Sequence, residues 1–155
     1  MGYLALKALH VLAVVLWVGG MAFAHFFLRP ALGVLEPAQR LRLMHDVLRR
    51  FLNAALVAVV LILASGTWMI GIVARAMAAA PSGFVMPPDW AVMTVVGLVM
   101  VAIFAHVRFV RFRQLQAAVQ ASQWPAAAAA LASIRRWVVV NLALGAGLSA
   151  GVLAF

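Results

Sequence analysis

The chain has 155 residues, of which 68% are hydrophobic and only 10% are charged. Soluble domains are about half apolar and about a quarter charged, so this composition is typical of a protein that lies in a lipid bilayer. Twelve Lys and Arg against three Asp and Glu do not indicate a nucleic-acid partner, because the basic residues form short clusters between long uncharged stretches. The lack of cysteine excludes disulfides, thiolate metal sites and covalently attached c-type haem.

Four apolar stretches predict four transmembrane helices, at about residues 4–28, 51–74, 90–107 and 138–155. Each is long enough, since roughly 20 helical residues cross the ~30 Å hydrocarbon core. The first is too long for a cleaved signal peptide, and Met21-Ala22-Phe23 is a poor cleavage site, so we expect a retained helix. The expected fold is an all-α integral membrane protein, a single four-helix domain over residues 1–155.

Basic residues predict the orientation of this bundle. The segment between spans one and two and the segment between spans three and four carry five arginines each, whereas the other side has only Lys7 and Arg75. Because lysine and arginine concentrate in cytoplasmic loops, we expect both arginine-rich segments inside and both termini outside. A multi-pass protein of the bacterial cytoplasmic (inner) membrane is the expected localisation.

Each arginine-rich segment also predicts an amphipathic cytoplasmic helix. Glu36-Pro37 is typical of a helix start, and the apolar residues beyond it recur at helical spacing: Leu41, Met44, Leu48 and Leu52. Trp124-Pro125 begins an alanine-rich helix that leads into span four. The outer loop is predicted to be non-helical from Pro81, Gly83, Pro87 and Pro88. Basic helices of this kind anchor to anionic headgroups, so the lipid bilayer is the first expected partner.

Small residues line one side of span four. Asn141, Gly145 and Ser149 recur at intervals of four, with Gly147-x-x-x-Gly151 beside them. Small residues at this spacing let helices approach closely in lipid. The pattern predicts tight packing within one bundle, and a homodimer interface is the alternative that it leaves open.

Histidines are the main candidates for chemistry, because polar residues inside a membrane span are costly and therefore usually functional. Neutral imidazole is a ligand for haem iron and copper, and methionine thioether suits Cu(I) or an axial haem position. The three acidic residues, Glu36, Asp46 and Asp89, lie outside the span interiors. This argues against a proton-relay transporter and against a carboxylate-bridged di-iron site.

The depth of each histidine decides which ligands can cooperate. The flanking basic residues place His10 near the outer surface, and His25 and His106 near the inner surface. His10 and His25 are 15 residues apart, or about 22 Å along a helix, so they cannot bind one ion. We expect His25 and His106 to form an inner pair. His10 is expected to have Met93 or Met100 as its partner on the outer side.

Several short motifs resemble a known membrane family. Residues 6–11 (Leu-Lys-Ala-Leu-His-Val) and the later Trp17-Val18-Gly19-Gly20 are similar to the first span of the copper-resistance D (CopD-type) membrane domain family and of the related HemJ-type protoporphyrinogen oxidases. Further similar positions are Leu43-Met44, Ala105-His106 and Arg136-Trp137 with Asn141. HemJ-type proteins follow that asparagine with an acidic residue and a proline, where this chain has Leu142 and Ala143, so the CopD-type match is closer.

The resemblance implies a four-helix membrane bundle that holds haem b, with His10 as first ligand candidate and Met44 and His106 as secondary ones. His10 is expected near the outer surface and Met44 in a cytoplasmic helix, so these two should not bind one iron. Further candidates for cofactor contact are Arg50 and Arg108, because guanidinium groups pair with the propionates of haem, and Asn141, which matches the pattern of the last HemJ-type span.

Three functional hypotheses follow. The first is a haem b membrane protein for electron transfer or tetrapyrrole redox chemistry, with a redox partner. The second is copper uptake or transfer across the inner membrane, with His10 and methionines as ligands and a periplasmic copper carrier as partner. The third is a non-catalytic membrane subunit whose histidines serve only the packing. The sequence does not decide whether the protein is an enzyme.

Overall fold

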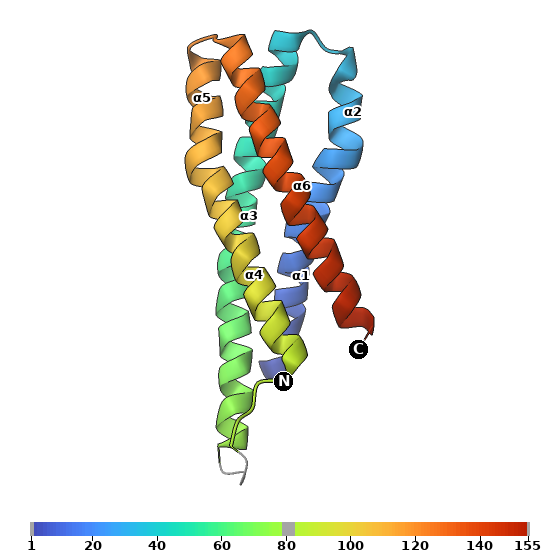
Figure 1. Ribbon diagram of the computed structural model, residues 1–155, viewed down its shortest axis with the longest axis vertical. Helices are drawn as coiled ribbons and strands as arrows, with labels where there is room; N and C mark the ends of the chain where they lie inside the picture. The colour runs from blue at the N-terminus through green and yellow to red at the C-terminus, as the bar shows by residue number, and fades with distance from the viewer. Residues whose placement is uncertain (1, 79–82, 155) are drawn as a thin grey trace.

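The computed structural model describes residues 2–78 and 83–154, with side chains up to residue 151. In these residues the chain runs up and down four times as long helices (Figure 1). Two of the four contain a π-helical turn. The elements are α1 (Gly2–Phe23), η1 (Ala24–Leu28, π-helical), α2 (Arg29–Ala31), η2 (Leu32–Val34, 3-10), α3 (Pro37–Met77), α4 (Pro88–His106), η3 (Val107–Arg111, π-helical), α5 (Phe112–Gln120) and α6 (Trp124–Ala154).

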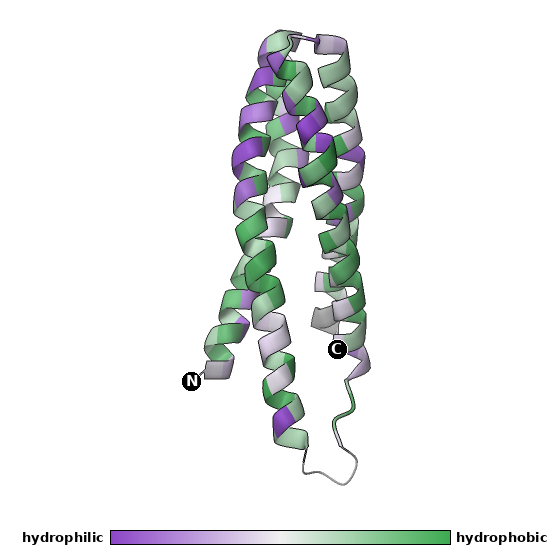
Figure 2. Ribbon diagram, turned by 90° about the vertical axis from the view of Figure 1, so that its left-hand side faces the viewer, coloured by the Kyte–Doolittle hydropathy of each residue, from purple (hydrophilic) through white to green (hydrophobic). Residues whose placement is uncertain are grey.

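Four helical segments are long and apolar enough to cross a membrane: Gly2–Val34, Pro37–Met77, Pro88–Gln120 and Trp124–Gly151. The predicted all-α membrane protein with four transmembrane helices is therefore confirmed. Both ends of the chain lie at the end of the bundle opposite the two arginine-rich segments (Figure 1), and hydrophilic residues gather toward the arginine-rich end (Figure 2). We call the end with the termini the outer end and the arginine-rich end the inner end. That the termini face outside stays a prediction.

The inner halves of the helices extend beyond the predicted spans. With 41 residues, α3 is about 61 Å long, twice the ~30 Å of the hydrocarbon core. It begins at Pro37 after an extended Glu36, and α6 begins at Trp124, so both predicted helix starts are confirmed. At the outer end, Gly83–Pro87 is non-helical as predicted, and Pro88 is the first residue of α4. Pro81 lies outside the described residues.

Buried residues recur every seven positions along the helices. On α3 they include Leu41, Leu48, Ala55 and Met69, and on α6 they include Ala127, Ile134 and Asn141. A repeat of seven keeps one seam of a helix against its neighbours at a shallow crossing angle. Large apolar residues cover the outside, for example Leu12 (66% exposed) and Trp68 (66% exposed), as a protein in lipid requires.

The small residues of span four lie in two different environments. A Cβ atom on Gly145 would lie 2.9 Å from Val18 Cγ2 and 3.0 Å from Met100 Cε, so α6 packs closely on α1 and α4 at this glycine. At Gly147 and Gly151 a Cβ atom would meet no described atom within 4 Å. The predicted tight packing within the bundle is thus found at Gly145, whereas Gly147-x-x-x-Gly151 faces away from it, and a homodimer stays a prediction.

A methyl group added at Gly145 should therefore affect the stability differently from one added at Gly147. We expect Gly145→Ala to lower the stability by about 1–2 kcal/mol, because Val18 and Met100 must move to admit the new atom. Gly147→Ala should leave the stability unchanged or raise it slightly, since alanine favours the helix and meets no neighbour. Thermal unfolding of both variants in detergent measures the difference. Equal midpoints for the two variants would contradict the close approach at Gly145.

Candidate functional site

His10 on α1 is held by two consecutive residues of α3. Its Nδ1 atom lies 3.0 Å from Ser65 Oγ, and Ser65 is only 2% exposed. The Ser65 hydroxyl also lies 2.5 Å from the carbonyl oxygen of Leu61, to which it donates. A hydroxyl has a single proton, and Ser65 donates it to Leu61. The His10 Nδ1–H group must therefore be the donor in the bond between His10 and Ser65. This arrangement leaves the lone pair of Nε2 free for a ligand.

Gly66 provides the second constraint on this imidazole. A Cβ atom at Gly66 would lie 3.3 Å from His10 Cε1 and 3.7 Å from Nδ1, so the ring packs directly over the α3 backbone. Ser65 and Gly66 were not among the predicted site residues. Their contact with His10 joins positions 55 residues apart, and no local pattern in the sequence indicates it.

His106 lies in a different setting at the inner end of α4. The Arg111 Nε–H group donates to His106 Nε2 over 3.1 Å, and the indole of Trp137 packs edge-on to the imidazole at 5.4 Å. A metal ion at Nε2 would first have to displace the guanidinium group. His106 is therefore a weaker candidate for a metal ligand than His10.

A cavity of about 840 Å³ opens at the inner end, between the end of the first long helix and the beginnings of α3 and α6. Its lining includes both His25 and Met44, an imidazole and a thioether. The cationic side chains that line it are Arg29, Arg40 and Arg135, and the rest is mainly apolar. The structure thus brings His25 to the same cavity as Met44, whereas His106, its predicted partner, contacts Arg111 and Trp137.

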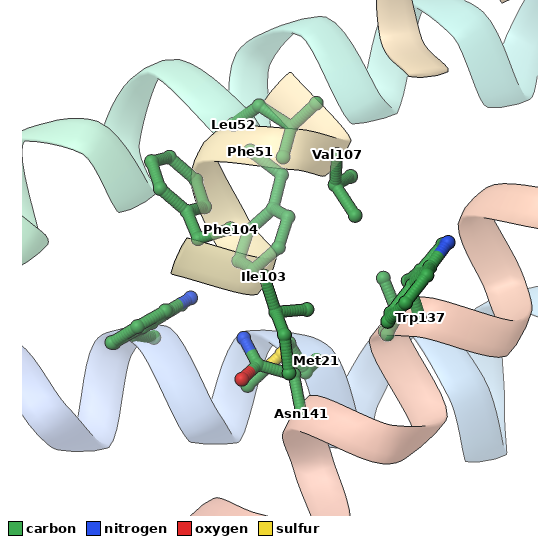
Figure 3. A pocket seen from close by; sticks show the side chains of 10 residues that line it. Met21, Phe51, Leu52, Ile103, Phe104, Val107, Trp137 and Asn141 are labelled. Atoms are coloured by element: carbon green, nitrogen blue, oxygen red, sulfur yellow. The ribbon is translucent and has the colours of Figure 1, made fainter. Parts of the chain in front are cut away.

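A second, much smaller cavity of about 20 Å³ lies in the centre of the bundle (Figure 3). All four long helices contribute to it, through Trp17, Met21, Phe51, Leu52, Ile103, Phe104, Val107, Trp137, Val138 and Asn141. Asn141 is 3% exposed, and its Oδ1 atom has no hydrogen-bond partner among the described residues.

The remaining predicted residues are spread over the bundle. Met100 is 3% exposed and packs near Val18 and Gly145, while Met93 is half-buried on the same helix. Arg108 donates to Asn53 Oδ1 over 3.0 Å, and Arg50 is exposed. These side chains do not form a cluster: within the described part of the chain, no group of three or more His, Cys, Asp and Glu residues is placed to hold a metal ion.

His45 is a polar residue that the sequence patterns did not single out. Its ring stacks on Phe112 at 5.4 Å with an angle of 7° between the planes, and its Nδ1 atom lies 3.0 Å from Asp46 Oδ1. His45 Nε2 is buried without a partner in the described residues. It lies one residue after Met44 at the inner end of α3, where apolar periodicity alone gives no sign of this stacking contact.

The fold and these sites define a four-helix membrane bundle whose interior holds separate imidazole, thioether and amide donors. The family model described as Copper resistance protein D matches residues 45–155, more than half of the chain. The chain therefore belongs to the copper resistance protein D family, which confirms the CopD-type resemblance; the HemJ-type resemblance is not shown. No curated protein and no solved structure matches the chain. The matched range includes Ser65, His106 and Asn141 but not His10.

The bond to Ser65 should set the tautomer of His10. We expect the His10 ring to carry its proton on Nδ1 in the wild type, and Ser65→Ala to release that preference because the acceptor is lost. The ¹⁵N chemical shifts of the histidine ring nitrogens measure the tautomer directly. Thr67→Ala is the matched control, since the Thr67 hydroxyl likewise bonds to its own helix at Leu63 but faces outward. An unchanged His10 tautomer in Ser65→Ala would show that the bond does not position the ring.

Proposed function

We propose that this protein binds copper at His10 and transfers it across the bacterial inner membrane. The observation that carries the proposal is the His10 imidazole, oriented by Ser65 so that Nε2 has a free lone pair, in a member of the copper resistance protein D family. Imidazole is a ligand type that copper prefers.

The surroundings of His10 are suited to a ligand that must also release its ion. A hydrogen bond to the other ring nitrogen orients a histidine and raises its affinity for a metal, which is the role we assign to Ser65. The interior of the predicted spans contains no carboxylate that would bind a cation strongly. Conduction requires binding that is strong enough for entry and weak enough for release. A periplasmic copper carrier that delivers the ion at the outer end is the partner this proposal implies.

Transport by purified protein in vesicles tests the proposal. We expect His10→Ala to reduce the initial rate of Cu(I) entry by about tenfold or more, because the first ligand is lost. Ser65→Ala should reduce it less, and Val11→Ala, a lipid-facing neighbour of His10, should leave it unchanged. A trapped Cu(I)-responsive dye reports the rate. Equal rates for wild type and His10→Ala would overturn copper transfer through His10 and favour the non-catalytic subunit.

Haem b is a second candidate, and one observation favours it. The inner cavity places the imidazole of His25 and the thioether of Met44 in one lining with three arginines, and these are the groups that hold haem iron and its propionates. Its volume of about 840 Å³ is within the range of small-molecule sites. A haem bound there would supply one-electron chemistry. The protein's own part would be to bind it and to keep it at the inner end.

An absorbance spectrum of the purified protein separates the two candidates. If haem b is bound in the inner cavity, we expect a Soret band in the wild type that His25→Ala and Met44→Leu shift or abolish and His10→Ala leaves in place. Each variant removes one of the two lining side chains that would hold the iron. A colourless preparation after expression with added haem would overturn the haem candidate.

A further inference from the structure

The inner cavity carries positive charge that its own lining does not neutralise. Arg29, Arg40 and Arg135 line it, and no aspartate or glutamate occurs among the described residues of the lining. The ion pair and the arginine hydrogen bonds found in the described part of the chain involve other residues. Cationic groups around one cavity repel one another, so this lining favours an anionic occupant.

The rest of the lining is mainly apolar, and it favours an occupant with a hydrocarbon part. Leu48 of α3 and Ile134 of α6 line the cavity and are 5% and 2% exposed. A free inorganic anion would gain nothing from such a surface, whereas a hydrocarbon chain is compatible with it. The volume of about 840 Å³ is in the upper part of the range of small-molecule sites. An anion with an attached apolar chain therefore fits both parts of the lining.

The arginines lie at the level where a membrane changes from hydrocarbon to headgroups. Phe26 and Phe27 are 62% and 67% exposed, as residues that face lipid are, and Arg29 follows two residues later. On α6, Arg135 comes three residues before Val138, where the fourth predicted span begins. The phosphate of a phospholipid in the leaflet at the inner end lies at this level, and its acyl chains lie at the level of the apolar lining.

We propose that the inner cavity binds one anionic phospholipid, with Arg29 and Arg135 at its phosphate and an acyl chain along the apolar lining. Guanidinium groups pair with phosphate through charge-assisted hydrogen bonds, and basic pockets between transmembrane helices bind anionic headgroups. This site is separate from the copper site proposed at His10 on the outer half of α1, and it does not depend on copper transfer. Haem b would use the same cavity and exclude the lipid, so it is an alternative occupant that the experiment must distinguish.

Native mass spectrometry of the delipidated protein with added dioleoyl phosphatidylglycerol tests this site. We expect one bound lipid in the wild type and an affinity at least about tenfold lower in Arg29→Gln/Arg135→Gln, because charge-assisted bonds are lost. The matched control is Arg113→Gln/Arg136→Gln, which removes the same charge from exposed arginines outside the lining and should bind like the wild type. Dioleoyl phosphatidylcholine has the same chains without the net charge and should bind more weakly than phosphatidylglycerol.

A change in the apolar lining separates a lipid from a free anion. Ala132 is a half-buried lining residue of α6, so Ala132→Phe narrows the cavity while it leaves the arginines in place. We expect this variant to bind phosphatidylglycerol more weakly, and Ala129→Phe, on an exposed position outside the lining, to bind it like the wild type. Inorganic phosphate in excess should not displace the lipid, because it makes no use of the apolar surface.

Other outcomes would overturn the lipid site in distinct ways. Equal losses in the two double arginine variants would show that the lipid responds only to the total charge of the inner end. Displacement by inorganic phosphate would assign the arginines to a free anion. A Soret band that His25→Ala removes, in protein that binds no phosphatidylglycerol, would assign the cavity to haem b. Binding of the lipid by protein that transfers no copper would support this site while the function proposed at His10 fails.

Discussion

Inside a bilayer a buried polar group has no water to bond with, so its partner must come from the protein. This constraint explains where most polar side chains of the bundle lie. Ser65 satisfies its proton on its own helix and then accepts from His10, and Arg111 at the inner end donates to His106. Among the described residues three buried atoms depart from this rule, because His45 Nε2, Arg108 Nε and Asn141 Oδ1 have no hydrogen-bond partner.

Close approach between helices makes these pairings available. Apolar side chains gain little by leaving lipid for one another, so helices in a membrane associate through dense packing, for which small residues are needed. Gly66 lets the His10 ring lie over α3, and Gly145 lets α6 pack against Val18 and Met100. The same small residues that let the helices pack closely therefore bring the imidazole of α1 against α3, and α6 against α1 and α4.

Properties that depend on a local stretch of sequence could be predicted, and those that depend on rotation about a helix axis could not. Local features include the length of each span, the arginine clusters and the helix starts at Pro37 and Trp124. The structure has the helices where these features predicted them. Residue counting gives the depth of a histidine but not the direction in which it points. His25 and His106 were paired by depth alone, yet His25 lines the cavity of Met44 and His106 bonds to Arg111.

Three residues of the first long helix that the copper proposal concerns lie in different surroundings. His10 is an imidazole that bonds to Ser65, Met21 is a buried thioether, and His25 is an imidazole in an open cavity lined with arginines. Arginine near the inner cavity repels a free cation, so an ion that reaches His25 is not held there by charge. In the copper transfer that we propose, this charge favours release at the inner end to an acceptor on that side.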